Sequence, residues 1–266
     1  KCRLWSSTSM SDMKIVAIIP ARMDSSRYPG KPLIDIEGLP MIEHVRRRTL
    51  MCNGFEDVIV ATCDQDIFDV VKHFNGNVVM TSNEHIMASD RVAEVAEKMD
   101  CTHVINVQGD EILILPEDLS KMVKAINASP ENMYWNATAP IDNEDELFDP
   151  SIVKCVINQQ KKIMYCARDF SSLKNLNGSF EPVRKILGIL GYSKNALLNY
   201  SGLHRSPLEI TQSIDQSRII ENDFPLFSVP FSVGFPGIND IREEKMVKVI
   251  LKTNKRQKEI LEQILN

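Results

Sequence analysis

Three cations and two hydroxyls follow the first apolar segment of the sequence. Residues 15–19 form an apolar run typical of a buried β-strand, because a strand covered on both faces is apolar throughout. The loop after this run contains Arg22, Ser25, Ser26, Arg27, Gly30 and Lys31. Open α/β sheets bind ligands at the carboxyl ends of their strands, so this loop is suited to a polyphosphate. A solvated basic loop is the alternative that composition leaves open.

A second polar segment, QGDE at residues 108–111, follows another predicted buried strand at residues 103–107. Asp110 beside a glycine is suited to Mg²⁺, which takes one or two carboxylates together with substrate phosphates. A helix cap is the alternative role for Asp110. Together, the cations and the carboxylate point to a nucleoside triphosphate with magnesium, and hence to phosphoryl or nucleotidyl transfer.

The composition excludes several classes of partner. The 266 residues carry a net charge of −5, which favours neither nucleic acid nor an anionic membrane. No apolar run approaches the roughly 18 residues that span a bilayer, so we expect no membrane insertion. Residues 1–13 lack the apolar core of a secretory signal and contain two candidate start methionines, and we treat them as an extension outside the fold.

The six cysteines are scattered, with no C-x-x-C pair and no Cys/His cluster. This spacing argues against a zinc site and for a reducing, cytoplasmic location. We expect most of the cysteines to be small core residues.

Strand and helix patterns alternate up to about residue 130. Strands are predicted at 57–62, 77–81 and 103–107, and helices at 41–51, 64–74, 89–99 and from 116 onward. Ser89 or Asp90 is expected to cap the third of these helices. The alternation predicts a mostly parallel sheet with helices on both faces. The dinucleotide-binding and P-loop fingerprints are both absent.

The second half of the sequence has a different pattern. Strands at 153–157 and 162–166 predict a hairpin, and further strands are expected at 185–192 and 224–233. Helices are predicted up to residue 200, at 206–222 and at 242–265. Residues 172–181 are either a lid or a disordered loop. The arginines at 46–48 and the run at 252–261 are expected to be solvated helix faces.

Several ordered segments resemble one family. They are IPARMDSSRYPGKPL (19–33), TSNEHIMASDRVAEV (81–95), INVQGDE (105–111), FDPSIVKCV (148–156) and SPLEITQSIDQSR (206–218). The sequence in this order resembles the cytidylyltransferases that activate acidic sugars, above all the CMP-Kdo synthetases (3-deoxy-manno-octulosonate cytidylyltransferases).

The resemblance implies an α/β fold with a Rossmann-like, mostly parallel sheet of the nucleotide-diphospho-sugar transferase type. It also implies a smaller mixed α/β lobe for dimerisation and acceptor binding. One domain would span 14–266, with a nucleotide-binding half (14–134), an acceptor and dimer lobe (135–222) and a closing strand and helix (223–266). The implied enzyme is a homodimer that uses Mg²⁺ to convert CTP and an acidic sugar into a CMP-sugar and pyrophosphate.

The family motifs assign roles to residues of this sequence. The implied catalytic residues are Arg22, Lys31 and Asp110. The implied nucleotide-binding residues are Ala21, Arg22, Ser25, Arg27, Lys31, Asp90, Arg91 and Gln108. The implied acceptor contacts are Gln108, Tyr192 and Asp215, and the implied metal ligands are Asp110 with Asn239 or Asp240. Arginine forks and a lysine point charge suit the charge that builds on departing pyrophosphate, and no Ser/His/Asp arrangement is expected.

The sequence departs from the family mainly on the acceptor and second-metal side. KILGILGYS (185–193) stands for the family's K-H-I-G-I-Y-A-Y-R, so the family histidine is Ile186 and the closing arginine is Ser193. In HIMASDR (85–91), Ala88 and Ser89 replace a glycine and a threonine. The second metal aspartate falls on Asn239, a neutral ligand that attracts Mg²⁺ less.

Three interpretations of these changes remain open: neutral drift, a changed acceptor, and a weakly active or inactive relative. From the family resemblance, we expect cytidylyl transfer to Kdo or a Kdo-like 2-keto sugar acid. The alternatives are the same transfer to an amino-Kdo, another ulosonic acid or a phosphonate, and a non-catalytic nucleotide-binding protein.

Overall fold

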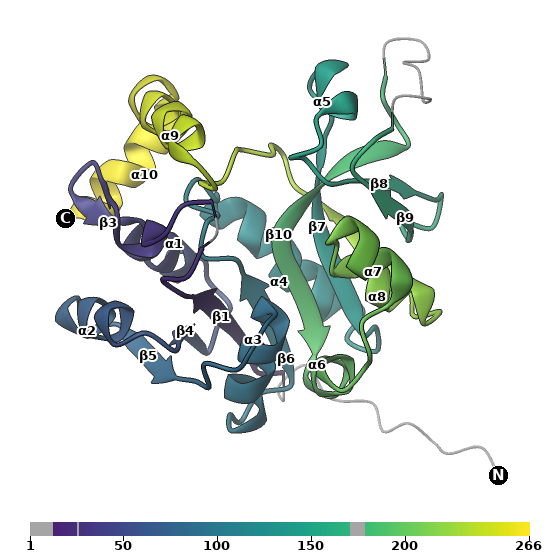
Figure 1. Ribbon diagram of the computed structural model, residues 1–266, viewed down its shortest axis with the longest axis horizontal. Coiled ribbons are helices and arrows are strands. Elements are labelled where there is room, and N and C mark those ends of the chain that lie inside the picture. The colour runs from purple at the N-terminus through teal and green to yellow at the C-terminus, as the bar shows by residue number, and fades with distance from the viewer. Residues whose placement is uncertain (1–12, 26, 171–178) are drawn as a thin grey trace.

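A central sheet of nine of the described strands runs through the molecule (Figure 1). The computed structural model describes residues 13–25, 27–170 and 179–266. The N-terminal extension up to residue 12, Ser26 and residues 171–178 of the predicted lid region lie outside the described residues. The sheet contains β1 (Ile15–Ala21), β4 (Asp57–Thr62), β5 (Asn77–Met80), β6 (His103–Val107), β7 (Tyr134–Pro140), β8 (Lys154–Ile157), β9 (Ile163–Ala167), β10 (Val183–Ser193) and β11 (Leu226–Pro230).

The sheet is mostly parallel around β1, as predicted. Its order is β11-β7-β10-β6-β1-β4-β5, and β1 pairs in parallel with both β4 and β6. The long strand β10 is antiparallel to both β6 and β7, while β11 and β7 are parallel. The predicted Rossmann-like α/β fold is therefore confirmed, with one antiparallel strand inserted beside β6.

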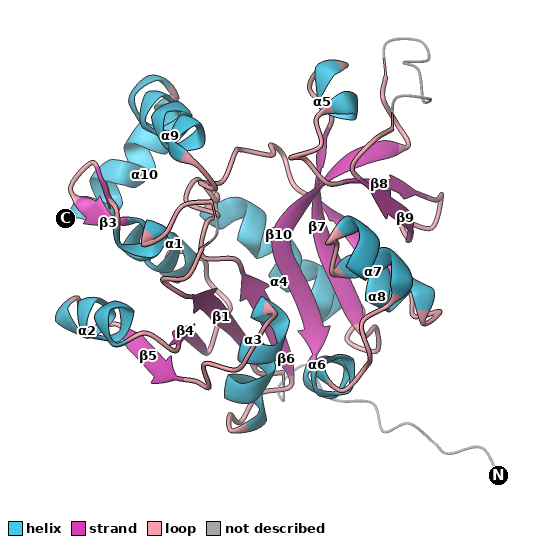
Figure 2. Ribbon diagram, viewed as in Figure 1, coloured by secondary structure: helices cyan, strands magenta, loops and turns pink. Residues whose placement is uncertain are grey.

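Helices cover both faces of the sheet because successive strand residues point in opposite directions. In β1, Ile15, Ala17 and Ile19 pack with α1 (Met41–Leu50), α2 (Gln65–His73) and α4 (Pro116–Ala128). Val16 and Ile18 pack with α3 (Ala88–Glu97), α6 (Lys194–Ser201) and α8 (Gln216–Glu221) on the other face. Figure 2 shows α3 and α8 in front of the sheet and α4 behind it. Ala21 at the end of β1 and Gln108 just after β6 border an open space, together with residues of α1 and α3.

Two predicted long helices are each interrupted. The region 206–222 forms α7 (Pro207–Gln212) and α8, separated by Ser213, whose φ of 53° lies in the left-handed region. The region 242–265 forms α9 (Ile241–Thr253) and α10 (Lys255–Leu265), because Asn254 is extended and its side chain caps α10. The single-helix predictions for both regions are wrong for these local backbone reasons.

Two further helix predictions are corrected by packing and capping. The residue before α3 is Met87 and no side chain caps this helix, so Ser89 and Asp90 lie inside its first turn. The predicted solvated arginine face of α1 is also wrong: Arg46 and Arg48 are buried. Arg48 donates to the Ile114 carbonyl at 3.3 Å and to a side-chain oxygen of α10 at 2.7 Å, because α10 covers this face of α1.

The remaining elements form a smaller lobe and an edge hairpin. β8 and β9 pair antiparallel, which confirms the predicted hairpin, and α5 (Asp145–Phe148) lies near it. Met164 and Tyr165 of β9 are exposed. β2 (Asp35–Ile36) and β3 (Leu39–Pro40) form a separate two-stranded sheet after a short 3₁₀ helix at Lys31–Leu33. The division at residues 134 and 222 and the homodimer both stay predictions.

The cysteines and the helix lengths bear on two other predictions. Cys52, Cys101, Cys155 and Cys166 are buried free thiols, which confirms the prediction of small core residues for these four.

Among the described residues, none of the helices combines the length and apolarity that crossing a membrane requires.

Gly109 brings the carboxyl ends of β1 and β6 together. A Cβ at this position would lie 2.8 Å from the carbonyl oxygen of Pro20, which is backbone and cannot rotate away. The Gly109→Ala variant should therefore lower the free energy of unfolding by about 1–3 kcal/mol, the usual cost of overpacking.

Urea denaturation of Gly109→Ala and Gly202→Ala measures this effect. Gly202 is the matched control, because its Cβ would meet nothing closer than 3.5 Å. Equal stability of the two variants would contradict the close approach.

Candidate functional site

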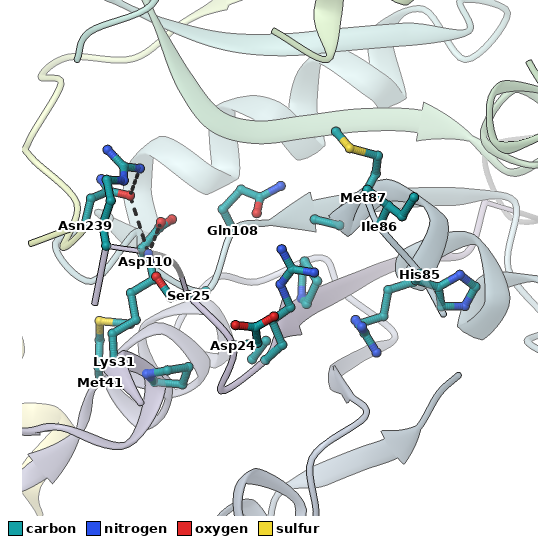
Figure 3. A pocket seen from close by; sticks show the side chains of 18 residues that line it. Asp24, Ser25, Lys31, Met41, His85, Ile86, Met87, Gln108, Asp110 and Asn239 are labelled. Carbon is teal, nitrogen blue, oxygen red and sulfur yellow. Dashed lines mark hydrogen bonds and ion pairs between the residues drawn. The ribbon is translucent and has the colours of Figure 1, made fainter. Parts of the chain in front are cut away.

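A cavity of about 320 Å³ opens at the carboxyl ends of β1 and β6 (Figure 3). Most of the predicted site residues line it: Ala21, Arg22, Ser25, Arg27, Lys31, Arg91, Gln108, Asp110 and Asn239. Asp90, Tyr192, Asp215 and Asp240 are not among its lining residues. The structure thus brings together the predicted nucleotide side and leaves most of the predicted acceptor side elsewhere.

The basic loop folds back over the end of β1. Gly30 adopts a left-handed backbone (φ 75°), and its N–H donates to the Met23 carbonyl at 2.9 Å. The Met23 N–H in turn donates to a carboxylate oxygen of Asp64 at 2.8 Å. This turn places Lys31 at the start of the 3₁₀ helix, on the cavity wall.

Lys31, Asp110 and Asn239 meet at one side of the cavity, as the dashed lines of Figure 3 show. The Lys31 ammonium lies 2.7 Å from Asp110 Oδ2 and 3.5 Å from Asn239 Oδ1. It also donates to the Ile238 carbonyl at 3.0 Å. Arg27 donates to the same Asn239 oxygen at 3.0 Å. Lys31 therefore contacts both the Asp110 carboxylate and the Asn239 amide oxygen, whereas Arg27 contacts the Asn239 oxygen.

Asn239 reaches this point because the segment after β11 returns close to Asp110. The Ile238 N–H donates to the Asp110 carbonyl at 3.3 Å. A Cβ on Gly237 would lie 2.9 Å from that carbonyl oxygen, so a glycine permits the approach. The closing segment at residues 237–239 thereby completes a cavity wall that begins more than 200 residues earlier in the sequence.

Asp240 has a different role from the predicted metal ligand. It caps α9, accepting from the N–H groups of Arg242 and Glu243, and Glu243 completes a capping box. Its carboxylate also pairs with the Arg242 guanidinium at 2.7 Å. These hydrogen bonds, with Arg242 first, lower the pKa of Asp240 to about 2. The carboxylate therefore serves the helix and does not reach the cavity.

The loop before α3 forms the opposite side of the cavity. Its residues His85, Ile86 and Met87 line the space, and Ile86 is strongly exposed. Glu94 of α3 fixes the loop by accepting from the Ser82 N–H at 2.9 Å and contacting His85 at 2.7 Å. These two contacts lower the pKa of Glu94 to about 2.

Arg91 and Asp90 of α3 differ in whether they line the cavity. Arg91 is buried and donates to the Ser82 carbonyl at 3.1 Å and to the Thr81 hydroxyl. Asp90 does not line the cavity, and one of its carboxylate oxygens is buried and has no hydrogen-bond partner among the described residues. Only Arg91 of this pair is therefore placed to meet a ligand directly.

Two of the predicted acceptor contacts lie away from the cavity. Tyr192 is buried in the core, edge-on to Tyr134 and tilted against Tyr200. Burial is the largest cause of the raised pKa of Asp215, about 6, and the negative charge of Glu209 adds to it. Ser193, at the position of the family's closing arginine, caps α6. Only Gln108 of the three predicted acceptor contacts lines the cavity, and the acceptor roles stay predictions.

Some residues at the site were not singled out from the sequence. Asp24, in the basic loop, lines the cavity beside Ser25. Glu111 accepts from the Gly188 N–H at 2.6 Å, and burial followed by the nearby Asp110 charge raises its pKa to about 7. Asp24 belongs to the basic loop and Glu111 to the QGDE segment. A carboxylate in either segment could point into the cavity or into the protein interior, and its residue type does not tell which.

Comparison with known proteins identifies the family of this arrangement. Residues 16–226 match the cytidylyltransferase family. The chain belongs to this family. The resemblance predicted from the sequence is therefore confirmed, and the family places the chain among the nucleotidyltransferase enzymes.

Two similar curated relatives are both named 3-deoxy-manno-octulosonate cytidylyltransferase. The relative from Geobacter metallireducens is 34% identical over 239 residues, which cover 85% of this chain and 93% of the relative. The relative from Escherichia coli is 35% identical over 226 residues, covering 85% and 91% of the two chains.

Solved structures agree with this grouping. A structure of CMP:2-keto-3-deoxy-manno-octonic acid synthetase complexed with CTP superposes with a TM-score of 0.83 at 33% identity. The match covers 90% of this chain and 98% of that one. A cytidylyltransferase from Leptospira borgpetersenii shares the fold, with a TM-score of 0.62 at 18% identity over 95% and 94% of the two chains.

The capping role of Asp240 can be tested by two substitutions. Asp240→Ala should measurably lower the free energy of unfolding, because the cap oxygen is lost. Asp240→Asn keeps an oxygen acceptor at the cap and should remain close to the unsubstituted protein. Thermal or urea denaturation separates the two variants, and equal destabilisation of both would contradict a capping role.

Proposed function

We propose that this protein transfers CMP from CTP to an acidic sugar, with Mg²⁺, and releases pyrophosphate. The proposed acceptor is Kdo or a Kdo-like 2-keto sugar acid. The observation that carries the proposal is the joint presence of Arg22, Arg27, Lys31 and Asp110 around one cavity. The family membership and the likeness to a CTP-bound synthetase support the same chemistry.

The donor set fits a magnesium ion carried by a nucleotide. Asp110 offers a carboxylate and Asn239 an amide oxygen at the same point of the cavity, within reach of the same Lys31 ammonium. Mg²⁺ takes hard oxygen ligands and usually combines one or two carboxylates with substrate phosphates and water. When bound, the ion would neutralise triphosphate charge and polarise the α-phosphate.

The chain's own side chains would act by position and charge. Arg22 and Arg27 can grip phosphate oxygens with two parallel N–H groups, and Lys31 supplies a point charge. The acceptor hydroxyl oxygen forms a bond to the α-phosphorus as the bond from that phosphorus to the β-phosphate oxygen breaks, and the hydroxyl proton passes to water. The negative charge that develops on pyrophosphate is met by these cations. No covalent intermediate with the protein is required.

The acceptor side favours one specific alternative. Ile186 stands at the position of the family histidine and packs in an apolar cluster with Leu190 and Tyr192. An apolar side chain there cannot make the contact that a histidine would make with the acceptor, so an acidic acceptor would have to be held by other groups. A different acidic acceptor for the same CTP chemistry is therefore the second candidate.

A panel of acceptors tests the proposal. Purified protein with CTP, Mg²⁺ and each of several acidic sugars should release pyrophosphate with Kdo and form a CMP-sugar detectable by mass spectrometry. Asp110→Asn should reduce the rate at least ~100-fold, the scale of one lost transition-state charge contact. Asp223→Asn is the control, because Asp223 lies on an exposed turn away from the cavity.

The other outcomes separate the alternatives. Reaction with non-Kdo acceptors alone would overturn the acceptor assignment and leave CMP transfer standing. CTP binding without pyrophosphate release from any acceptor would favour the non-catalytic interpretation.

A further inference from the structure

Lys31 forms an ion pair with Asp110, whose carboxylate the proposed metal would need as a ligand. Its ammonium lies 2.7 Å from Asp110 Oδ2, and the two side chains are only 15% and 27% exposed. The Ile238 carbonyl and the Asn239 amide oxygen hold the same ammonium from the other side. An ion pair in this partly buried setting is screened less than one in open solvent. A metal ion at Asp110 Oδ2 would compete with Lys31, and one at the other oxygen would lie beside the Lys31 charge.

The charge around this point disfavours a dication in the absence of nucleotide. Asp110 contributes one negative charge here, whereas Lys31 and Arg27 contribute two positive charges: Lys31 bonds to Asp110, and both cations bond to the neighbouring Asn239 oxygen. Asn239 is neutral, and its oxygen already receives both cations. The described parts of the chain contain no group of three or more His, Cys, Asp or Glu side chains that could hold a metal ion.

A triphosphate would reverse this balance. It brings several negative charges into the same cavity and offers Lys31 and Arg27 stronger acceptors than an amide oxygen. The ammonium can then leave Asp110, whose carboxylate becomes free to bind a cation. The nucleotide would supply the remaining oxygen ligands.

We propose that Lys31 closes the metal site in the nucleotide-free protein and that the triphosphate opens it by drawing Lys31 away from Asp110. The proposal rests on the proposed function for the identity of the triphosphate and of the metal. Metal and nucleotide then bind with positive coupling, which by thermodynamic linkage is the same for either order of binding. Asn239 helps to keep Lys31 paired with Asp110. An aspartate at this position would offer Lys31 a second carboxylate and so weaken its pairing with Asp110.

Titration with Mn²⁺ alone, followed by electron paramagnetic resonance, tests this exchange without catalysis. Lys31→Met removes the ammonium but keeps the apolar stem, and should increase Mn²⁺ affinity by about tenfold or more, given the strength of a unit charge at contact distance in a partly buried site. Asn239→Asp should also increase Mn²⁺ affinity in the absence of nucleotide. The double variant Lys31→Met/Asp110→Asn should lose the gain, which locates the bound ion at Asp110.

The result that would overturn the proposal is Mn²⁺ affinity in Lys31→Met no higher than in the unsubstituted protein. Tight Mn²⁺ binding by the unsubstituted protein without nucleotide would overturn it as well. Circular dichroism shows whether each variant is folded, and Lys31→Gln, which also removes the charge but keeps a polar side chain, keeps the test decisive if Lys31→Met fails to fold. Calorimetric titration with CTP and Mg²⁺ is a separate measurement: absence of CTP binding would contradict the proposed function and leave the Mn²⁺ result valid.

Discussion

The contact between Lys31 and Asp110 joins three segments that are far apart in the sequence. Lys31 comes from the loop after β1, Asp110 from the turn after β6, and the Ile238 carbonyl that shares the ammonium comes from the segment after β11. The parallel pairing of β1 with β6 makes the first two neighbours. Glycines at 109 and 237 let the backbones approach closely enough for the charges to meet. The cavity has its shape because these three segments converge.

The first half of the fold was readable from the sequence because its signals are local. β4 and β6 are found where the apolar runs predicted them, and α1, α2 and α4 follow the expected amphipathic spacing. β7 was not predicted, because its residues Tyr134–Pro140 are buried between β10 and β11, and only those neighbours make it a strand. The breaks at Ser213 and Asn254 depend on single backbone conformations that a hydrophobic pattern does not reveal.

The site residues were predictable where a sequence motif fixes the course of the backbone. They were less predictable where the direction of a side chain decides whether it faces the cavity. The basic loop and QGDE both face the cavity, since each follows the carboxyl end of a parallel strand. Tyr192 has the residue type of a ligand contact, but side chains alternate along β10 and this one points into the core with Leu190. Asp240 has the charge of a metal ligand, but its position before α9 makes it a cap. The burial of Arg48 depends on α10, which is distant in the sequence.

The residues predicted to bind the nucleotide and those predicted to bind the acceptor differ in where the fold places them. The cations and Asp110 surround one cavity, in agreement with the family to which the chain belongs. The positions that differ from the family pattern, Ile186 and Ser193, pack in the fold or cap a helix. The ion pair between Lys31 and Asp110, which an arriving triphosphate would break, therefore lies at the centre of this cavity's chemistry.

A crystal structure of the protein with CTP and Mg²⁺ tests this central claim most directly. The account predicts the triphosphate between the basic loop and Asp110, with the Lys31 ammonium bonded to phosphate oxygens and Asp110 facing the metal. CTP bound outside this cavity, or Lys31 still paired with Asp110 beside a bound triphosphate, would contradict it.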